Sequence, residues 1–219
     1  MAKTILTPFQ KSALSEITKT PGLVKRFYLT GGTALAEFHL HHRLSEDLDF
    51  FSEEEFSLLP IQAFIKNLIL KLQLEKTEYR NQMGLHTFFL HKDSEALKID
   101  FNYYPFPRLD KKLHFKNLSI DSMFDIAVNK LQTISTQPRS RDFIDLYCII
   151  QQTGWSINEL RKQARIKFDW YVDSVQLGSR MLMVKEFKDF PRMLIPFDFK
   201  TCEAFWLNQA RNLGKDILK

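Results

Sequence analysis

The segment from residue 73 to residue 104 constrains the fold most, because its residues follow the pattern of an antiparallel sheet. Its strand-like runs are Gln73 to Arg80, His86 to His91 and Ala96 to Tyr104, separated by turn-like stretches at 81–84 and 92–95. Strands joined by turns this short pair as antiparallel neighbours, since a parallel pair needs a long crossover. Pro105 and Pro107 end this meander, and a run from about Leu113 to Leu118 is a candidate edge strand.

Helices and two short strands are expected before the meander. They are a helix from about Pro8 to Thr18 ended by Pro21-Gly22, a strand from Arg26 to Leu29, a helix through Leu40 with Thr33 as its N-cap, and a strand from Leu48 to Phe51. Ser52 and Glu55 have the spacing of a capping box, which predicts that another helix follows.

Beyond residue 120 the pattern changes from strands to helices. The expected helices run from Met123 to Ile134, from Arg139 to Gln151 and from a Ser156 N-cap through Arg165, before a less regular C-terminus. A chain of 219 residues can form two compact lobes. We therefore predict an α+β fold, with a mixed or antiparallel sheet flanked by helices in residues 1–120 and a mainly helical lobe in residues 121–219.

Composition indicates a globular protein without a membrane span. Hydrophobic residues make up 44% and charged residues 26%, and no apolar run reaches the roughly 18 residues of a spanning helix. We expect a cytoplasmic protein with no membrane partner. Cys148 and Cys202 lie in apolar surroundings, which favours buried thiols over a disulfide or metal site. The net charge of +5 weakly favours polyanionic partners.

An acidic pair at Asp47 and Asp49 is the first candidate for chemistry. Side chains two apart in a strand lie on one face, so the two carboxylates converge while Leu48 points into the core. Like charges this close repel unless a cation lies between them, and hard oxygen ligands suit Mg²⁺ or Mn²⁺. The alternative is a polar strand end exposed to solvent.

A glycine pair lies upstream, at the start of an expected helix. Gly31 and Gly32 would let the backbone approach a phosphate closely, and the free N–H groups at a helix N-terminus favour anions. The alternative is an ordinary turn that needs a positive φ.

These two features together resemble a known family. The stretch from Leu29 to Leu35, followed by the stretch from His42 to Phe51, is similar to the AbiEii/AbiGii toxin family, a branch of the DNA polymerase beta-like nucleotidyltransferases. Fourteen residues separate Gly32 from Asp47, and Gly32 stands where many relatives have serine. The resemblance implies that Thr33 or Ser45 supplies the hydroxyl contact to phosphate instead.

Two further stretches resemble the family, and the resemblance spans residues 27 to 150. Asp100, which shares a strand face with Lys98 and Asn102, would complete the metal cluster as a third carboxylate. In the helical part, Lys130 would contact the triphosphate, and the run that contains Asp145 would close the site. The residues themselves leave other roles open: a surface ion pair for Lys98 and Asp100, an intrahelical salt bridge between Arg141 and Asp145, and a charge in the first helical turn for Asp142.

The resemblance implies a metal-dependent nucleotidyltransferase that moves a nucleoside monophosphate from a triphosphate to an acceptor hydroxyl. The acceptor would be the 3′ end of a tRNA or other RNA, or a protein side chain, and the enzyme would be a toxin paired with an antitoxin. The implied metal ligands and catalytic residues are Asp47, Asp49 and Asp100; the implied nucleotide-binding residues are Gly31, Gly32, Thr33, Arg43, Ser45, Lys98, Lys130 and Asp145. The cofactor would be Mg²⁺ or Mn²⁺.

Other interpretations remain for the chain and for its histidines. The domain would alternatively be an inactive relative that binds a nucleotide or a partner protein, or a generic RNA-binding module whose binding needs no divalent metal. His39, His41 and His42 form a cluster, but no accompanying ligand set favours zinc, and solvated or partner-facing histidines are the better expectation. The aromatic run from Phe101 to Phe106 is better explained by packing than by stacking on bases.

Overall fold

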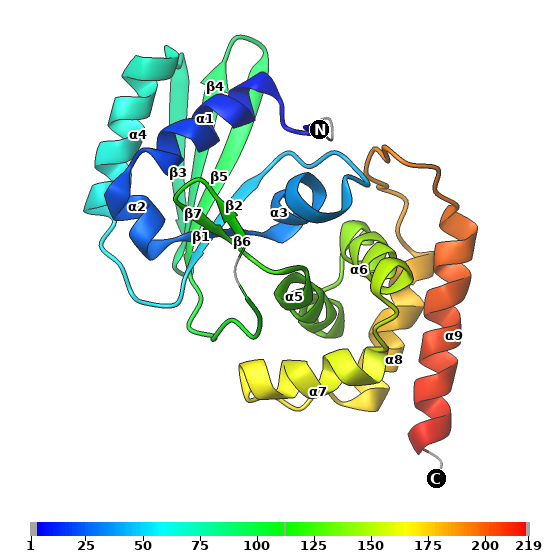
Figure 1. The fold of residues 1–219 in the computed structure, drawn as a ribbon. Helices are drawn as coiled ribbons and strands as arrows, with labels where there is room; N and C mark the ends of the chain where they lie inside the picture. The colour runs from blue at the N-terminus through cyan, green and yellow to red at the C-terminus, as the bar shows by residue number, and fades with distance from the viewer. Residues whose placement is uncertain (1–3, 112, 218–219) are drawn as a thin grey trace. The chain divides into compact units, whose positions relative to one another are not determined.

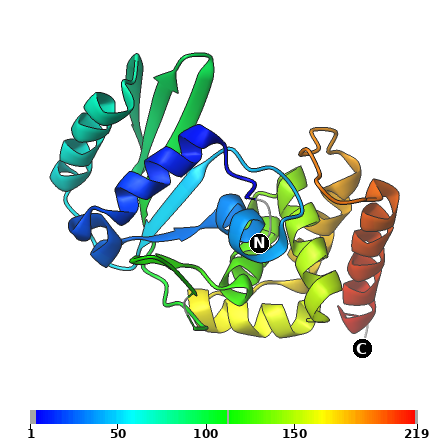
Figure 2. The ribbon, with the colours of Figure 1, turned by 45° about the horizontal axis from the view of Figure 1, so that its top comes forward.

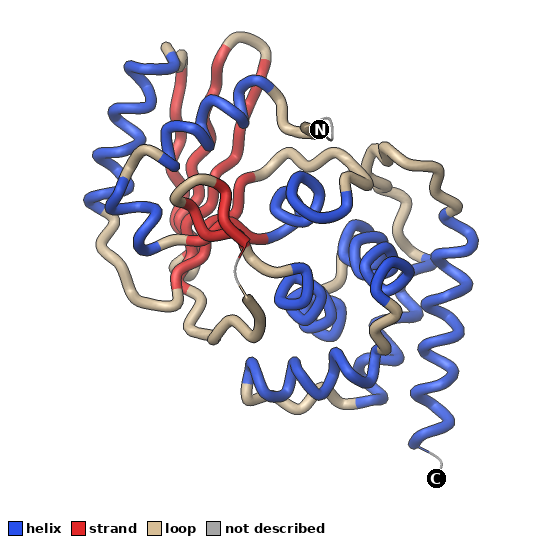
Figure 3. Tube along the Cα trace, viewed as in Figure 1, coloured by secondary structure: helices blue, strands red, loops and turns tan. Residues whose placement is uncertain are grey.

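A computed structural model describes residues 4–111 and 113–217 of the chain. Unit 1 comprises Met1–His39, Leu44–Pro107 and Lys111–Ser122; unit 2 comprises Leu40–Arg43, Arg108–Asp110 and Met123–Lys219. Strands, which are red in Figure 3, form the sheet of unit 1, whereas the helices after residue 122 belong to unit 2. Over the described ranges, no helix has the length and apolar character needed to cross a membrane.

Unit 1 is a mixed sheet with helices against it, which confirms the predicted fold class. Its helices are α1 (Pro8–Thr18), α2 (Pro21–Arg26), α3 (Gly31–Leu35), the π-helix η1 (Ala36–Leu40) and α4 (Leu59–Leu72). Its strands are β1 (Tyr28–Thr30), β2 (Leu48–Ser52), β3 (Lys76–Gln82), β4 (Leu85–Lys92), β5 (Glu95–Tyr103), β6 (Leu113–Phe115) and β7 (Leu118–Ile120). The described strands lie in the order β3-β4-β5-β2-β1-β7-β6.

The sheet combines the predicted meander with a parallel pairing that sequence alone does not reveal. Strands β3, β4 and β5 are antiparallel neighbours, as predicted, and β2 joins β5 in parallel. Figures 1 and 2 show α1 and α4 side by side against the sheet, with α2 next to them. Beneath these helices the stacked rings of Phe50 and Phe101, with centroids 5.3 Å apart, are fully buried. Phe101 is therefore a core residue, as the packing interpretation predicts.

Four local predictions in unit 1 are wrong. Thr33 is not an N-cap, because α3 already begins at Gly31 with Thr30 in the capping position. Ser52 does not cap a helix; its hydroxyl donates to the Glu54 carbonyl, and α4 begins only at Leu59. The other two errors concern extent: Pro21-Gly22 starts a short helix rather than only ending one, and the expected edge strand at 113–118 is one arm of the β6–β7 hairpin.

Unit 2 is mainly helical, as predicted. Its helices are α5 (Met123–Thr136), α6 (Ser140–Thr153), α7 (Ile157–Phe168), α8 (Ser174–Leu182), the short 3₁₀ helix η2 (Met183–Lys185) and α9 (Phe199–Ile217). The predicted Ser156 N-cap is confirmed, since its hydroxyl and the Glu159 carboxylate form a reciprocal capping box. The fully buried Trp206 of α9 donates to the Phe143 carbonyl at 3.1 Å and joins α9 to α6.

Candidate active site

Two neighbouring parallel strands bring the predicted carboxylates of unit 1 together. Asp49 on β2 is paired in register with Asp100 on β5, and Asp47 lies two residues before Asp49. Side chains in register on adjacent strands point to the same face, as do side chains two apart. Asp100 is nearly buried, with 11% of its side chain exposed, whereas 26% of the Asp47 side chain is exposed. The sheet therefore presents Asp47, Asp49 and Asp100 on one face.

Lys98 lies among these carboxylates. Its Nζ is 2.6 Å from Asp100 Oδ2 and 3.5 Å from Asp47 Oδ2, and Thr87 donates to the other Asp100 oxygen at 2.6 Å. Burial would lower the pKa of Lys98, but its hydrogen bond to Asp100 and the charges of Asp100, Asp47 and Asp49 outweigh burial and raise the pKa. A cation is thus already stabilised at this face.

Gly31 makes room for one of the carboxylates. It has a positive φ of 73°, and a Cβ atom added there would lie 2.3 Å from Asp49 Oδ2. Two residues later, the Thr33 hydroxyl donates to the Asp47 carbonyl and ties the start of α3 to the entry of β2. The glycine pair and the acidic pair, which are separate in the sequence, are therefore parts of one local structure in unit 1.

Gly31→Ala is expected to destabilise the protein, because a methyl group would collide with Asp49 in an unfavourable backbone conformation. A left-handed non-glycine residue costs about 1–3 kcal/mol, and overpacking costs a further ~1–3 kcal/mol. Gly84→Ala is the matched control, since Gly84 has a φ of 83° but no atom within 4 Å of the added Cβ. The measurement is urea denaturation of both variants; equal losses would show that the Asp49 contact contributes nothing.

A second charged cluster forms in unit 2, around Asp145 on α6. Arg43 donates to it twice, from Nε at 2.6 Å and from a terminal nitrogen at 2.8 Å, and His42 Nε2 lies 2.8 Å from the same carboxylate. Lys130 Nζ bridges Asp145 at 2.8 Å and Asp142 at 2.7 Å. We call these five residues the Asp145 network. All five are buried.

The network keeps both of its carboxylates ionised. Burial would raise the pKa of Asp145, but the charges of Lys130 and Arg43, with the hydrogen bonds from Arg43 and His42, outweigh burial and hold the pKa well below its usual range. For Asp142, burial is likewise outweighed by Lys130 and Arg139, so its pKa is also lowered. The network therefore consists of charged groups that neutralise one another without solvent.

The structure thus divides the predicted site residues into two groups. Unit 1 contains Asp47, Asp49, Asp100, Lys98, Gly31, Gly32, Thr33 and Ser45; unit 2 contains Arg43, Lys130 and Asp145. The ion-pair interpretation of Lys98 and Asp100 is met by the geometry, but inside the acidic face rather than at an isolated surface position. The ionic partners of Asp145 among the described residues are His42, Arg43 and Lys130 rather than Arg141.

The expectation of solvated or partner-facing histidines is wrong for His42, which is 1% exposed. His39 also has a partner inside the protein, because its Nε2 lies 2.9 Å from the Asp121 carbonyl oxygen. Both cysteines are free thiols, and burial raises the pKa of each to about 12. They are unreactive thiols, as expected.

Whether the acidic face fits a divalent ion can be judged from its donors. Within the described ranges, no group of three or more His, Cys, Asp and Glu side chains is arranged to hold a metal ion as it stands. The donor set nevertheless suits a hard cation, because Asp47 and Asp100 already contact one ammonium and Asp49 adds its field. A divalent ion fits here in place of the Lys98 ammonium.

Solved structures with a similar fold come from Helicobacter pylori. The chain resembles JHP933 with a TM-score of 0.57 at 20% identity, over 94% of this chain and 90% of JHP933. It resembles a candidate nucleotidyltransferase from the same organism with a TM-score of 0.59 at 18% identity, over 96% of this chain and 97% of the other. At these identities the likeness concerns the fold, which is that of a nucleotidyltransferase.

Comparison at the sequence level defines the family. Residues 12–210 match the family model described as "Nucleotidyl transferase AbiEii toxin, Type IV TA system". The chain is also 32% identical over 162 residues to the uncharacterised protein aq_aa25 of Aquifex aeolicus strain VF5, which covers 73% of this chain and 74% of the relative. The chain belongs to the AbiEii family of nucleotidyltransferases, as its sequence motifs predict.

Proposed function

We propose that this protein catalyses a metal-dependent transfer of a nucleoside monophosphate from a triphosphate to an acceptor hydroxyl. The observation that carries the proposal is the pairing of Asp49 with Asp100 in register, on the same face as Asp47 and around the Lys98 ammonium. A Mg²⁺ or Mn²⁺ ion held by these carboxylates would neutralise phosphate charge and lower the pKa of the attacking hydroxyl.

The residues of the chain would bind and orient the triphosphate. Once its carboxylate partners are neutralised, the Lys98 ammonium can pair with a phosphate oxygen. The N–H groups at the start of α3, near Gly31 and Gly32, and the hydroxyls of Thr33 and Ser45 are the further donors we assign to phosphate in unit 1. Nucleotide-binding roles for Arg43, Lys130 and Asp145 remain predictions; in the structure these three are paired with one another.

We further propose an RNA 3′ end, such as that of a tRNA, or a protein hydroxyl as acceptor, and a toxin whose activity is restrained by an antitoxin. Family membership supports this setting. The reaction consumes nucleoside triphosphates, which supports a cytoplasmic location.

The test is to incubate the purified protein with each α-labelled nucleoside triphosphate, Mg²⁺ or Mn²⁺, and either total RNA or a protein extract. Transfer of label to one acceptor class, abolished by EDTA, is the expected result. If no acceptor gains label with any triphosphate and metal, the transfer proposal is overturned. Triphosphate binding without transfer would indicate an inactive nucleotide-binding relative, and metal-independent RNA binding would indicate an RNA-binding module.

Lys98→Met is expected to increase the stabilisation that Mg²⁺ confers, because the ammonium and a divalent ion compete for the same carboxylate oxygens. Without metal, the variant should melt below the wild type, since Asp47 and Asp100 lose their shared cation. The measurement is the Tm with and without millimolar Mg²⁺, and Lys66→Met, at an exposed position of α4, is the matched control. A Mg²⁺-induced rise no larger than that of the wild type would contradict the competition.

A further inference from the structure

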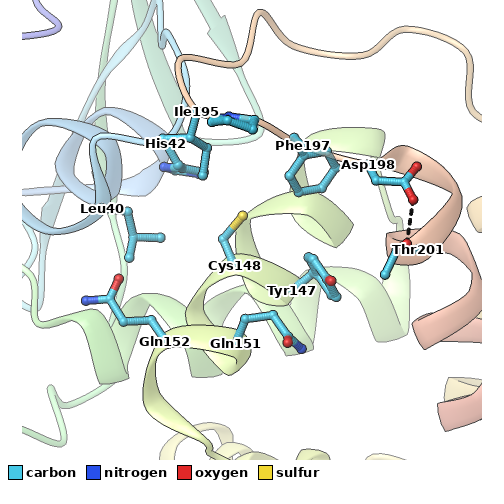
Figure 4. A pocket seen from close by; sticks show the side chains of 11 residues that line it. Leu40, His42, Tyr147, Cys148, Gln151, Gln152, Ile195, Phe197, Asp198 and Thr201 are labelled. Atoms are coloured by element: carbon cyan, nitrogen blue, oxygen red, sulfur yellow. Dashed lines mark hydrogen bonds between the residues drawn. The ribbon is translucent and has the colours of Figure 1, made fainter.

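Unit 2 contains a pocket that the transfer reaction does not use. Its volume is about 410 Å³, which is within the range of small-molecule sites. Figure 4 shows side chains from α6, from the segment before β2 and from the loop before α9 around the same space. The residues around it are Leu40, His42, Tyr147, Cys148, Gln151, Gln152, Ile195, Pro196, Phe197, Asp198 and Thr201.

Hydrogen bonds and ring packing fix the walls of this pocket. The backbone N–H of Leu194 donates to the His42 carbonyl at 2.8 Å, and Arg43 forms a β-bridge with Met193. Across the pocket, the rings of Tyr147 and Phe197 are perpendicular, with centroids 5.8 Å apart. The loop before α9 is thus joined to the segment that contains His42, and the cavity is built from ordered backbone.

His42 presents an unsatisfied hydrogen-bond acceptor in this pocket. Its Nε2 lies 2.8 Å from Asp145 Oδ1, and the ionised Asp145 carboxylate can only accept a hydrogen bond. In the neutral imidazole the hydrogen must therefore be on Nε2, which leaves a lone pair on Nδ1. That Nδ1 is buried and has no hydrogen-bond partner among the described residues. Buried polar atoms are nearly always paired, so this atom points to a ligand that donates an N–H or O–H group.

The other lining residues define the chemistry of that ligand. No described lining residue is a lysine or arginine, and Asp198 contributes a negative charge, so the pocket disfavours phosphates and carboxylates. Gln151 and Gln152 supply amides that both donate and accept, and Tyr147 and Phe197 supply aromatic surface.

We propose that this pocket binds an uncharged planar nitrogen heterocycle of the nucleobase class. A ring N–H would donate to His42 Nδ1, the amides of Gln151 and Gln152 would bind the polar edge of the ring, and Phe197 would contact its face. The base is supplied by a free nucleoside or by a nucleotide of an RNA strand. Binding requires neither a triphosphate nor a metal ion, so it is separable from the proposed transfer reaction.

The test is binding of adenosine, guanosine, cytidine, uridine and a four-nucleotide RNA, each added separately to the full chain without metal or triphosphate. Amide NMR signals of Tyr147 to Gln152 should shift saturably with at least one probe, and the His42 Nδ1 signal should move toward its hydrogen-bonded value. Binding of a nucleoside indicates a free ligand, whereas binding of only the RNA indicates a base within a strand; either result supports the proposal.

The variant Gln151→Ala/Gln152→Ala should weaken this binding about tenfold or more, as expected for the loss of two polar contacts of ~1 kcal/mol each. Both glutamines are exposed, so the variant should retain the fold, which its NMR spectrum would verify. Gln137→Ala, at an exposed position outside the pocket, is the matched control. The proposal is overturned if no probe shifts the pocket signals at millimolar concentration, if phenol shifts them equally, or if the double variant binds as tightly as the wild type.

Discussion

Asp49→Asn is expected to lower the rate of nucleotidyl transfer on the order of 10³-fold while leaving the fold intact. Asparagine keeps the shape of the side chain but removes one negative charge from the acidic face, where Asp49 is in register with Asp100. Divalent ions bind neutral amide oxygens far less strongly than carboxylates, so charge at the reacting phosphate would no longer be neutralised. The fold should persist because the substitution reduces repulsion between neighbouring acids.

The rate is measured as label transfer under single-turnover conditions, and the fold by circular dichroism. Asp93→Asn is the matched control, since Asp93 lies exposed in the β4–β5 turn with a φ of 52°, a conformation that asparagine tolerates. A folded Asp49→Asn protein with the activity of the control would exclude a catalytic role for this carboxylate.

Much of the fold could be predicted because its signals are local. Alternating residues and short turns determine the β3–β4–β5 meander, and the Ser156 capping box begins α7 as expected. The capping predictions at Thr33 and Ser52 failed because each hydroxyl has another partner, the Asp47 carbonyl for Thr33 and the Glu54 carbonyl for Ser52. A capping residue is recognised by its type, but its partner is chosen by tertiary structure.

The candidate site was predictable to a similar depth. The two-residue period of a strand places Asp47 and Asp49 on one face, but only the parallel pairing of β2 with β5 brings Asp100 beside Asp49. The contact between His42 and Asp145 joins residues 103 positions apart, and no local pattern indicates it. The sequence does contain one signal that was available: His42 directly precedes Arg43, so both can face the same partner when the segment bends.

Asp145→Ala is expected to destabilise the protein by about 3–5 kcal/mol, because removing one partner of a buried ion pair leaves the others uncompensated. Arg43 would lose both of its hydrogen bonds to Asp145, and Lys130 would retain only Asp142. The measurement is urea denaturation at neutral pH, and Asp189→Ala, at an exposed loop position, should change the stability by no more than about 0.5 kcal/mol.

The pH dependence of this difference has a defined sign. The pKa of Asp145 is lowered by folding from its ordinary value of 3.8, so its contribution is fully present above that value. As the pH falls through the lowered pKa, the folded protein also binds the proton and the contribution is lost. The stability difference between the wild type and Asp145→Ala should therefore be constant near neutral pH and shrink in acid.

A second variant tests whether the uncompensated charge causes the loss. Arg43→Met/Asp145→Leu removes both members of one ion pair and keeps the pair between Lys130 and Asp142. Replacing a buried ion pair by apolar side chains of similar volume is often neutral or stabilising, so this variant should recover at least about half of the stability lost in Asp145→Ala. If it is no more stable than Asp145→Ala, the loss comes from the cavity rather than from charge. If Asp145→Ala is as stable as Asp189→Ala, the Asp145 network does not stabilise unit 2.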